Sequence, residues 1–162
     1  MINCVVAVEQ GQGIGFEGLM PWPRLKGDMQ WFKDITTDHI VIMGSTTWKS
    51  LGKPLPNRIN VVISSQLQTG SNFTYENPVD AINDLRERFA RKDIYIIGGQ
   101  ALYDSVKELV DIFFVTEIEQ SYTCDKFFNL EYVKNTCTNI REMLNFEATA
   151  TTPAYIIKEY KK

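Results

Sequence analysis

An aspartate in the first third of the chain lies on the apolar face of a segment with helical spacing. Asp28 falls among four apolar residues that recur at helical intervals: Leu25, Met29, Phe32 and Ile35. A carboxylate on such a face costs free energy unless it is hydrogen-bonded, paired or protonated. It is either a boundary residue satisfied by its neighbours, or a binding-site acid that grips the amidine-like edge of a heterocycle and assists proton transfer. The preceding loop, which carries Trp22, favours the second interpretation.

Glycines occur in two settings that could hold a phosphate. Gly13-Ile-Gly15-Phe-Glu-Gly18 matches a dinucleotide-binding fingerprint, but Met20-Pro21-Trp22-Pro23 stands where that fingerprint requires a helix. We therefore interpret these glycines as turn residues of a mobile loop. Later, a strand runs through Gly98-Gly99 into a helical segment, and Gly44 precedes Thr46-Thr47 in the same way. Two such turns at carboxyl ends of parallel strands predict a crevice for a dinucleotide.

Apolar runs that are typical of buried strands alternate with segments of helical period. We expect strands at Ile2–Val8, Ile40–Met43, Ile59–Ile63, Ile94–Ile97 and Ile112–Val115, and helices at Leu25–Ile35, Thr46–Leu51, Val79–Phe89 and Ala101–Leu109. This alternation predicts an α/β fold with a mostly parallel central sheet of about eight strands and flanking helices.

Local signals add three features to this plan. Asn77, followed by a proline, predicts the start of the third helix. Arg141–Thr149 and Ala154–Tyr160 predict a C-terminal antiparallel hairpin. Glu9–Arg24 is the longest irregular stretch, and a loop of that size in a compact domain is more often functional than idle.

The composition indicates one globular domain over residues 1–162. The chain is 44% hydrophobic and 23% charged, and its net charge of -3 offers no basic field for a nucleic acid. No apolar stretch reaches the length that spans a bilayer, and the three cysteines, Cys4, Cys124 and Cys137, are scattered. We therefore expect a cytoplasmic protein with no disulfide, metal site or membrane partner. His39, the only histidine, is interpreted as a solvated turn residue.

Several spaced motifs resemble the dihydrofolate reductase family along nearly the whole chain. The matching pieces are Ile14-Gly15, Met20-Pro21-Trp22, Asp28, Trp31-Phe32, Val41-Ile42-Met43-Gly44, Thr47-Trp48, Leu55-Pro56-Asn57-Arg58, Ser64-Ser65, Ile97-Gly98-Gly99, Tyr103 and Thr116. Motifs in the right order are more specific than any one of them. The resemblance implies an enzyme that reduces dihydrofolate with NADPH, supports one-carbon metabolism and thymidylate synthesis, and binds antifolate inhibitors.

The resemblance also implies roles for residues at the substrate. Asp28 would bind the 2-amino group and N3 of the pterin, with Thr116 hydrogen-bonded to its carboxylate, and Arg58 would take the glutamate α-carboxylate. The remaining substrate residues implied are Val5, Val6, Met29, Phe32, Leu51, Leu55, Ile97 and Tyr103. The apolar ones are equally well explained as core, because pocket walls and cores use the same residue types.

By the same resemblance, the loop Gly13–Trp22 closes over the nicotinamide, with Met20 and Trp22 shielding the reaction from water. Hydride would pass from C4 of the nicotinamide to C6 of the pterin, and N5 would be protonated by water positioned through Asp28. A cis peptide is implied at Gly98-Gly99. The cofactor residues implied are Ala7, Ile14, Gly44, Ser45, Thr46, Thr47, Ser64, Ser65, Gly98, Gly99, Gln100, Ala101 and Leu102.

The chain departs from many family members where cations would hold the 2′-phosphate of NADPH. Ser45, Asn77 and Ala101 stand at positions where relatives carry basic residues, and Ser64 and Ser65 offer only neutral donors. We expect NADPH as cofactor, with a weakened preference over NADH. A preference as strong as in relatives that carry arginine would contradict this expectation.

Two alternatives stay open at this level. One is a reductase of the same fold that acts on a ribosylated pyrimidine in riboflavin synthesis, which the pair Asp28 and Arg58 disfavours. The other is a non-catalytic structural or nucleotide-binding protein, which Asp28 and Trp22 disfavour. Size and resemblance lead us to expect a monomer, since no coiled-coil repeat marks an interface.

Overall fold

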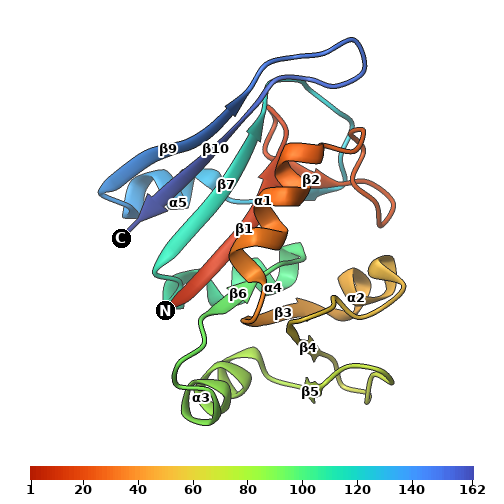
Figure 1. Ribbon diagram of the computed structural model, residues 1–162, viewed down its shortest axis with the longest axis vertical. Coiled ribbons are helices and arrows are strands. Elements are labelled where there is room, and N and C mark those ends of the chain that lie inside the picture. The colour runs from red at the N-terminus through yellow and green to blue at the C-terminus, as the bar shows by residue number, and fades with distance from the viewer.

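The computed structural model describes residues 1–162 and is built around an eight-stranded sheet (Figure 1). The strands of this sheet, in chain order, are β1 Ile2–Val8, β3 Ile40–Gly44, β4 Ile59–Ile63, β5 Phe73–Tyr75, β6 Ile94–Ile96, β7 Ile112–Ile118, β9 Asn139–Phe146 and β10 Tyr155–Lys161. Their spatial order is β5-β4-β3-β6-β1-β7-β10-β9. The first six strands in this spatial order, from β5 through β7, run parallel to one another, and β10 pairs antiparallel with both β7 and β9. The expected mostly parallel sheet and C-terminal hairpin are therefore confirmed.

Helices cover both faces of this sheet. They are α1 Lys26–Thr36, α2 Ser45–Leu51, α3 Pro78–Arg88, α4 Gln100–Val106 and α5 Leu130–Thr136. The main core packs apolar residues of α3, α4 and α5 against one face, whereas α1 and α2 contribute to smaller clusters on the other. Because the central strands of the sheet are buried on both faces, their sequences are continuous apolar runs rather than alternating apolar and polar residues. No helix has the length and apolarity needed to cross a bilayer.

The four expected helices are present, with small differences at their ends. Asn77 caps α3 as expected, and its side chain accepts hydrogen bonds from the backbone N–H groups of Val79 and Asp80. The helix expected over Ala101–Leu109 changes at its last turn into a 3-10 helix, Lys107–Leu109. Polar capping and apolar spacing locate helices well, but the type of the last turn depends on packing.

Four elements were not expected from the sequence. Helix α5 and strand β5 belong to the main layers, and β2 Gly13–Gly15 pairs with β8 Lys126–Phe127 in a separate small sheet. The stretch Glu9–Arg24 is thus not wholly irregular, because β8 holds its first half. Each of the three strands is two or three residues long, too short for a recognisable alternation of apolar and polar residues.

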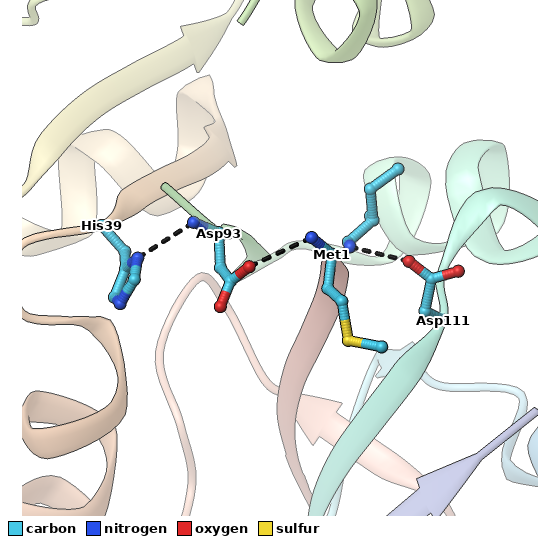
Figure 2. Close-up of polar contacts among 5 residues, drawn as sticks. Met1, His39, Asp93 and Asp111 are labelled. Carbon is cyan, nitrogen blue, oxygen red and sulfur yellow. Dashed lines mark hydrogen bonds and ion pairs between the residues drawn. The ribbon is translucent and has the colours of Figure 1, made fainter. Parts of the chain in front are cut away.

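His39 is not the solvated turn residue that the sequence indicated. It is half-buried, its Nδ1 accepts a hydrogen bond of 2.9 Å from the backbone N–H of Asp93, and its ring lies against Tyr95. Figure 2 shows the same Asp93 reaching the Met1 ammonium, 3.0 Å away, while Asp111 accepts from a neighbouring backbone N–H. These contacts join the starts of β1, β6 and β7, at the end of the strands opposite the glycine turns.

Candidate active site

Asp28 projects from the first turn of α1 toward the sheet. Thr116, a buried residue of β7, donates a hydrogen bond of 2.5 Å from its Oγ1 to Oδ1 of Asp28. Burial raises the pKa of the Asp28 carboxyl above its usual value, and the Thr116 hydroxyl opposes that rise. Oδ2 has no donor within the protein, so the carboxylate keeps an oxygen for a ligand.

The apolar face of α1 that carries Asp28 is only partly buried, so it is not the fully buried face that its apolar residues would suggest. Leu25 is 3% exposed, but Phe32 and Ile35 are half-buried and Met29 is 47% exposed. Apolar surface left open on a helix beside a desolvated acid is typical of a binding wall rather than a closed core.

The other expected wall residues divide between two faces of the sheet. Val5, Leu51, Leu55 and Ile97 are half-buried and pack around the cluster of Val41, Met43, Val62 and Tyr95, to which α1 also contributes through Ile35. By contrast, Val6 and Tyr103 belong to the main core on the opposite face. The Tyr103 hydroxyl nevertheless reaches back and donates a hydrogen bond of 2.7 Å to the carbonyl oxygen of Val5.

Arg58 lies at the far end of α1 from Asp28. Its Nη1 donates to Thr36 Oγ1 over 3.2 Å and its Nε donates to the Pro56 carbonyl over 2.8 Å, so the guanidinium is held although it is partly exposed. Desolvation lowers the pKa of Arg58 from its usual value, and the group remains a cation. Thr36 lies eight positions after Asp28, and at about 1.5 Å per residue this separates the two charged anchors by about 12 Å along the helix.

The two glycine turns lie side by side, as the sequence predicted. The N–H of Gly44 donates a hydrogen bond of 2.8 Å to the carbonyl of Gly98, and the Gly98-Gly99 peptide is cis, as the resemblance implied. Gly98 has a φ of 123°, a conformation that favours glycine. A Cβ on Gly98 would lie 3.3 Å from Tyr103 Oη and 3.4 Å from Thr47 Oγ1. The backbone is therefore open for close approach only because side chains are absent.

The other expected cofactor residues differ in whether their side chains are exposed, hydrogen-bonded within the protein or packed in the core. Ser45, Thr46 and Thr47 form the first turn of α2, and Ala101 is exposed in α4. The Gln100 side chain is already engaged, since its Oε1 accepts from the Phe127 N–H over 2.8 Å. Four further residues behave as follows: Ser64 Oγ accepts from Gln66 N and Gln68 Nε2, Ser65 is exposed, and Leu102 and Ile14 pack in or against the main core.

The 9–24 loop brings one of its two expected shielding residues into the interior. Trp22 is 8% exposed and packs with Leu25, Ile118 and Tyr155, beside Ala7. Met20 is 65% exposed, and the shielding role that the resemblance implied for it stays a prediction. In this conformation Trp22 fixes the end of the loop, and the apolar side chain of Met20 stays in solvent.

Three residues near the site were given no role by the sequence analysis. Glu9 is buried and accepts the backbone N–H groups of Gly13 and Tyr122, and Tyr155 accepts the Gly27 N–H at the start of α1. Trp31 Nε1 is buried with no partner in the protein, which leaves a donor free beside the Asp28 turn. Most of this is invisible in local sequence, because the bonds of Glu9 to Tyr122 and of Tyr155 to Gly27 join distant segments, and the burial of Trp31 depends on how the helix is packed.

A separate hollow of about 290 Å³ lies behind the loop and contains none of the expected site residues. Its lining carries mixed charges, and two of them are already paired, Lys158 with Glu117 at 3.2 Å. The His, Cys, Asp and Glu side chains form no cluster that could hold a metal ion. The candidate active site is therefore the arrangement of the desolvated acid, the apolar wall and the glycine turns.

Known proteins resemble this chain over most of its length. The viral dihydrofolate reductase of Saimiriine herpesvirus 2 (strain 488) is 36% identical over 152 residues, which are 83% of this chain and 71% of that protein. The dihydrofolate reductase of Staphylococcus aureus (strain Mu50 / ATCC 700699) is 36% identical over 128 residues, 78% of this chain and 77% of its own.

A solved structure, dihydrofolate reductase from Enterococcus faecalis complexed with NADP(H) and RAB-propyl, superposes with a TM-score of 0.82. The superposition covers 99% of this chain and 95% of the Enterococcus faecalis chain at 21% sequence identity, and it supports the fold. The sequence profile described as Dihydrofolate reductase matches residues 1–162. The chain belongs to the dihydrofolate reductase family.

Proposed function

We propose that this protein reduces dihydrofolate to tetrahydrofolate with NADPH as the reductant. The observation that carries the proposal is the Asp28 carboxylate, desolvated, held on one oxygen by Thr116 and open on the other. A carboxylate with one free oxygen suits the adjacent N–H groups of a 2-aminopterin ring, which bind such an acid in parallel. Antifolate inhibitors with the same N–H pattern would compete for it.

The spacing of charges along α1 supports a long substrate with two different ends. Asp28 at one end binds the nitrogen heterocycle, and Arg58 near the other binds the terminal carboxylate of the glutamate tail. Phe32, Leu51 and Leu55, half-buried between them, contact the flat rings. A ribosylated pyrimidine has no carboxylate for Arg58, which disfavours the riboflavin-pathway alternative.

The glycine turns fit a dinucleotide. Gly44, Gly98 and Gly99 leave backbone open next to the Thr47 hydroxyl, which allows a pyrophosphate to approach main-chain N–H groups. Ser45, Thr46, Ser64 and Ser65 would hold its phosphates and ribose. When bound, NADPH supplies the hydride for the reduction.

The protein's own contribution is orientation and a proton. The wall of half-buried residues stacks the pterin, Trp22 excludes water at one side, and Asp28 holds the ring in register. The raised pKa of the Asp28 carboxyl lies closer to neutral pH than that of an ordinary aspartate. The carboxyl can therefore take up a proton and pass it toward N5 through a positioned water molecule. The activity is that of a single-domain, cytoplasmic, monomeric enzyme.

One assay separates this proposal from the alternatives. We expect purified protein to oxidise NADPH only when dihydrofolate is added, with the rate followed by the fall in NADPH absorbance. A protein that folds and binds NADPH but never turns over dihydrofolate would support the non-catalytic alternative instead. Turnover of a ribosylated pyrimidine in place of dihydrofolate would support the riboflavin-pathway alternative.

Cofactor preference depends on three positions that lack a cation, one of them in the first turn of α2. Ser45, Asn77 and Ala101 provide no cation, and Asn77 is occupied in capping α3, so the 2′-phosphate of NADPH gains little over the hydroxyl of NADH. We expect Ser45→Arg to raise the ratio of kcat/KM for NADPH to that for NADH by about tenfold, the effect of one charge-assisted contact. Ser45→Gln, similar in length and neutral, is the control and should leave the ratio unchanged.

A further inference from the structure

The amino end of α1, which carries Asp28, has no side-chain cap of its own. The residue before the helix is Leu25, whose side chain cannot accept a hydrogen bond. Helix ends leave four backbone N–H groups unpaired, and these must find acceptors elsewhere. In this protein an acceptor comes from the opposite end of the chain: the N–H of Gly27 donates a hydrogen bond of 3.0 Å to the hydroxyl oxygen of Tyr155.

Tyr155 is held firmly enough to act as a fixed acceptor. It is 5% exposed, it pairs with Ile118 of β7 and Phe146 of β9, and its ring stacks on Phe146 with centroids 4.7 Å apart and planes at 18°. It also packs with Trp22 and Leu25 in one apolar cluster. A phenol in such a setting has little rotational freedom, so its oxygen defines a point in space.

The helix approaches this point so closely that only glycine fits. A Cβ on Gly27 would collide with the Phe146 ring and would lie 2.7 Å from Tyr155 Oη. The hairpin strands β9 and β10 therefore contact the main chain of α1 directly, one residue before Asp28. The contact is independent of the Thr116 hydroxyl, which reaches the Asp28 side chain from β7.

The polar surroundings of the Tyr155 hydroxyl are consistent with this contact. Burial raises the pKa of Tyr155, the N–H groups of Gly27 and Asp28 oppose that rise, and the Asp28 charge adds to it. Tyr103 on α4 is the other titratable group that responds to the charge of Asp28. Tyr155 thus lies within electrostatic reach of the acid and bonds to the backbone that carries it.

We propose that Tyr155 is a positioning residue for Asp28: its hydroxyl caps α1 and fixes the main chain at residues 27 and 28, so that the carboxylate stays in its desolvated place. This inference rests on the proposed dihydrofolate reductase activity. Thr116 orients the side chain, and Tyr155 orients the backbone. The C-terminal hairpin is in this way a part of the catalytic apparatus, although it contributes no group that touches the substrate.

The test is Tyr155→Phe, which removes the hydroxyl and keeps the ring, its stack on Phe146 and the strand pairing. Without the acceptor, the Gly27 and Asp28 N–H groups are exposed toward the carboxylate and α1 frays at its start, and both effects lower the pKa of Asp28. We expect kcat to fall about 2- to 10-fold, the value of one hydrogen bond. The pH profile of kcat/KM for dihydrofolate should move to lower pH, with KM for NADPH unchanged.

Tyr160→Phe is the matched control, because Tyr160 is also buried on β10 and its hydroxyl is also hydrogen-bonded, donating to Glu117 Oε2 over 2.7 Å. Both variants should lower the unfolding midpoint by similar amounts. Only Tyr155→Phe should shift the pH profile and speed amide hydrogen exchange at Gly27 and Asp28. Exchange is measured without substrate or cofactor, so it reports the cap by itself.

The outcomes distinguish the role of Tyr155 from the proposed function. An active wild-type protein whose Tyr155→Phe variant keeps the wild-type pH profile and amide exchange overturns the role of Tyr155 and leaves the proposed function standing. A wild-type protein without dihydrofolate-dependent turnover overturns the proposed function and with it the positioning role. A shift of equal size in Tyr160→Phe would show a general effect of the hairpin's stability and would also overturn the inference.

Discussion

Two carboxylates flank the 9–24 loop, and the protein treats them in opposite ways. Glu9, directly after β1, is 4% exposed, and it accepts the N–H of Gly13 over 2.6 Å and that of Tyr122 over 3.1 Å. Burial alone would raise the pKa of Glu9, but hydrogen bonds from three backbone N–H groups bring it below its usual value. Asp28, after the loop, has a single hydroxyl donor and a raised pKa.

The difference shows that the number of hydrogen-bond donors decides whether the effect of burial on the pKa of an acid is offset, as at Glu9, or remains, as at Asp28. Both oxygens of Glu9 accept backbone N–H groups, which hold the start of the loop against the segment before β8, so the role of Glu9 is structural. The charge of Asp28 is left partly uncompensated and one oxygen is free, so it can serve a ligand. A functional site is recognised here by what the fold leaves unsatisfied.

The comparison is tested most severely by Asp28→Asn. We expect kcat for dihydrofolate to fall about 100-fold or more near neutral pH, because the amide cannot exchange a proton and its NH₂ opposes the N–H groups of the pterin. Stability should hold or rise, since the ionised carboxylate is the form that burial disfavours. Dihydrofolate-dependent NADPH oxidation and thermal unfolding measure the two effects.

Asp34→Asn, on the exposed side of the same helix, is the control for that experiment and should leave kcat unchanged. Wild-type turnover in Asp28→Asn would remove Asp28 from the mechanism.

Glu9→Gln should show the reverse pattern, a loss of stability with little loss of turnover. The amide keeps one acceptor oxygen but turns NH₂ toward backbone donors, and we expect a cost of about 1–3 kcal/mol in the free energy of unfolding. The pKa of Glu9 is lower in the folded than in the unfolded protein, so its contribution is present above the usual value of 4.5 and is lost as pH falls through the folded pKa.

Urea unfolding near neutral pH and again near pH 4 measures this difference, which should shrink at the lower pH. Glu119→Gln, an exposed neighbour, is the control. A drop in kcat as large as in Asp28→Asn would erase the distinction between the two acids.

The sequence predicted the parts of this fold that depend on local patterns. The five long apolar runs, the Asn77 cap and the C-terminal hairpin all appear, because burial on both faces, a polar cap and a turn each leave a signature in neighbouring residues. The sequence also predicted that the two glycine turns would lie at the same edge of the sheet, since both follow parallel strands, and Gly44 indeed bonds to Gly98. Strands β2, β5 and β8 were missed because they are short and, unlike β6, are not part of a continuous apolar run.

The candidate site was predicted less completely, for a physical reason. Asp28 was found because a charge on an apolar face is unusual, and the bond from Thr116 followed from the resemblance. The roles of Glu9 and Tyr155 depend on contacts with segments more than one hundred residues away, which leave no trace in local spacing. Likewise the exposure of Met20 depends on how the loop lies, and this is a property of the conformation rather than of the residue type.

The smallest expected effect tests how far one donor tunes Asp28. Thr116→Val keeps the shape of the side chain and removes the hydroxyl that opposes the rise in the pKa of Asp28. That pKa should therefore rise further, and the pH profile of kcat/KM should move to higher pH, the direction opposite to that expected for Tyr155→Phe. We expect kcat to fall less than about tenfold, as for one hydrogen bond, and Thr116→Ser to restore the profile. A Val variant whose profile moves to lower pH would mean that another donor sets the pKa of Asp28, and the contrast with Glu9 would then need a different cause from donor number.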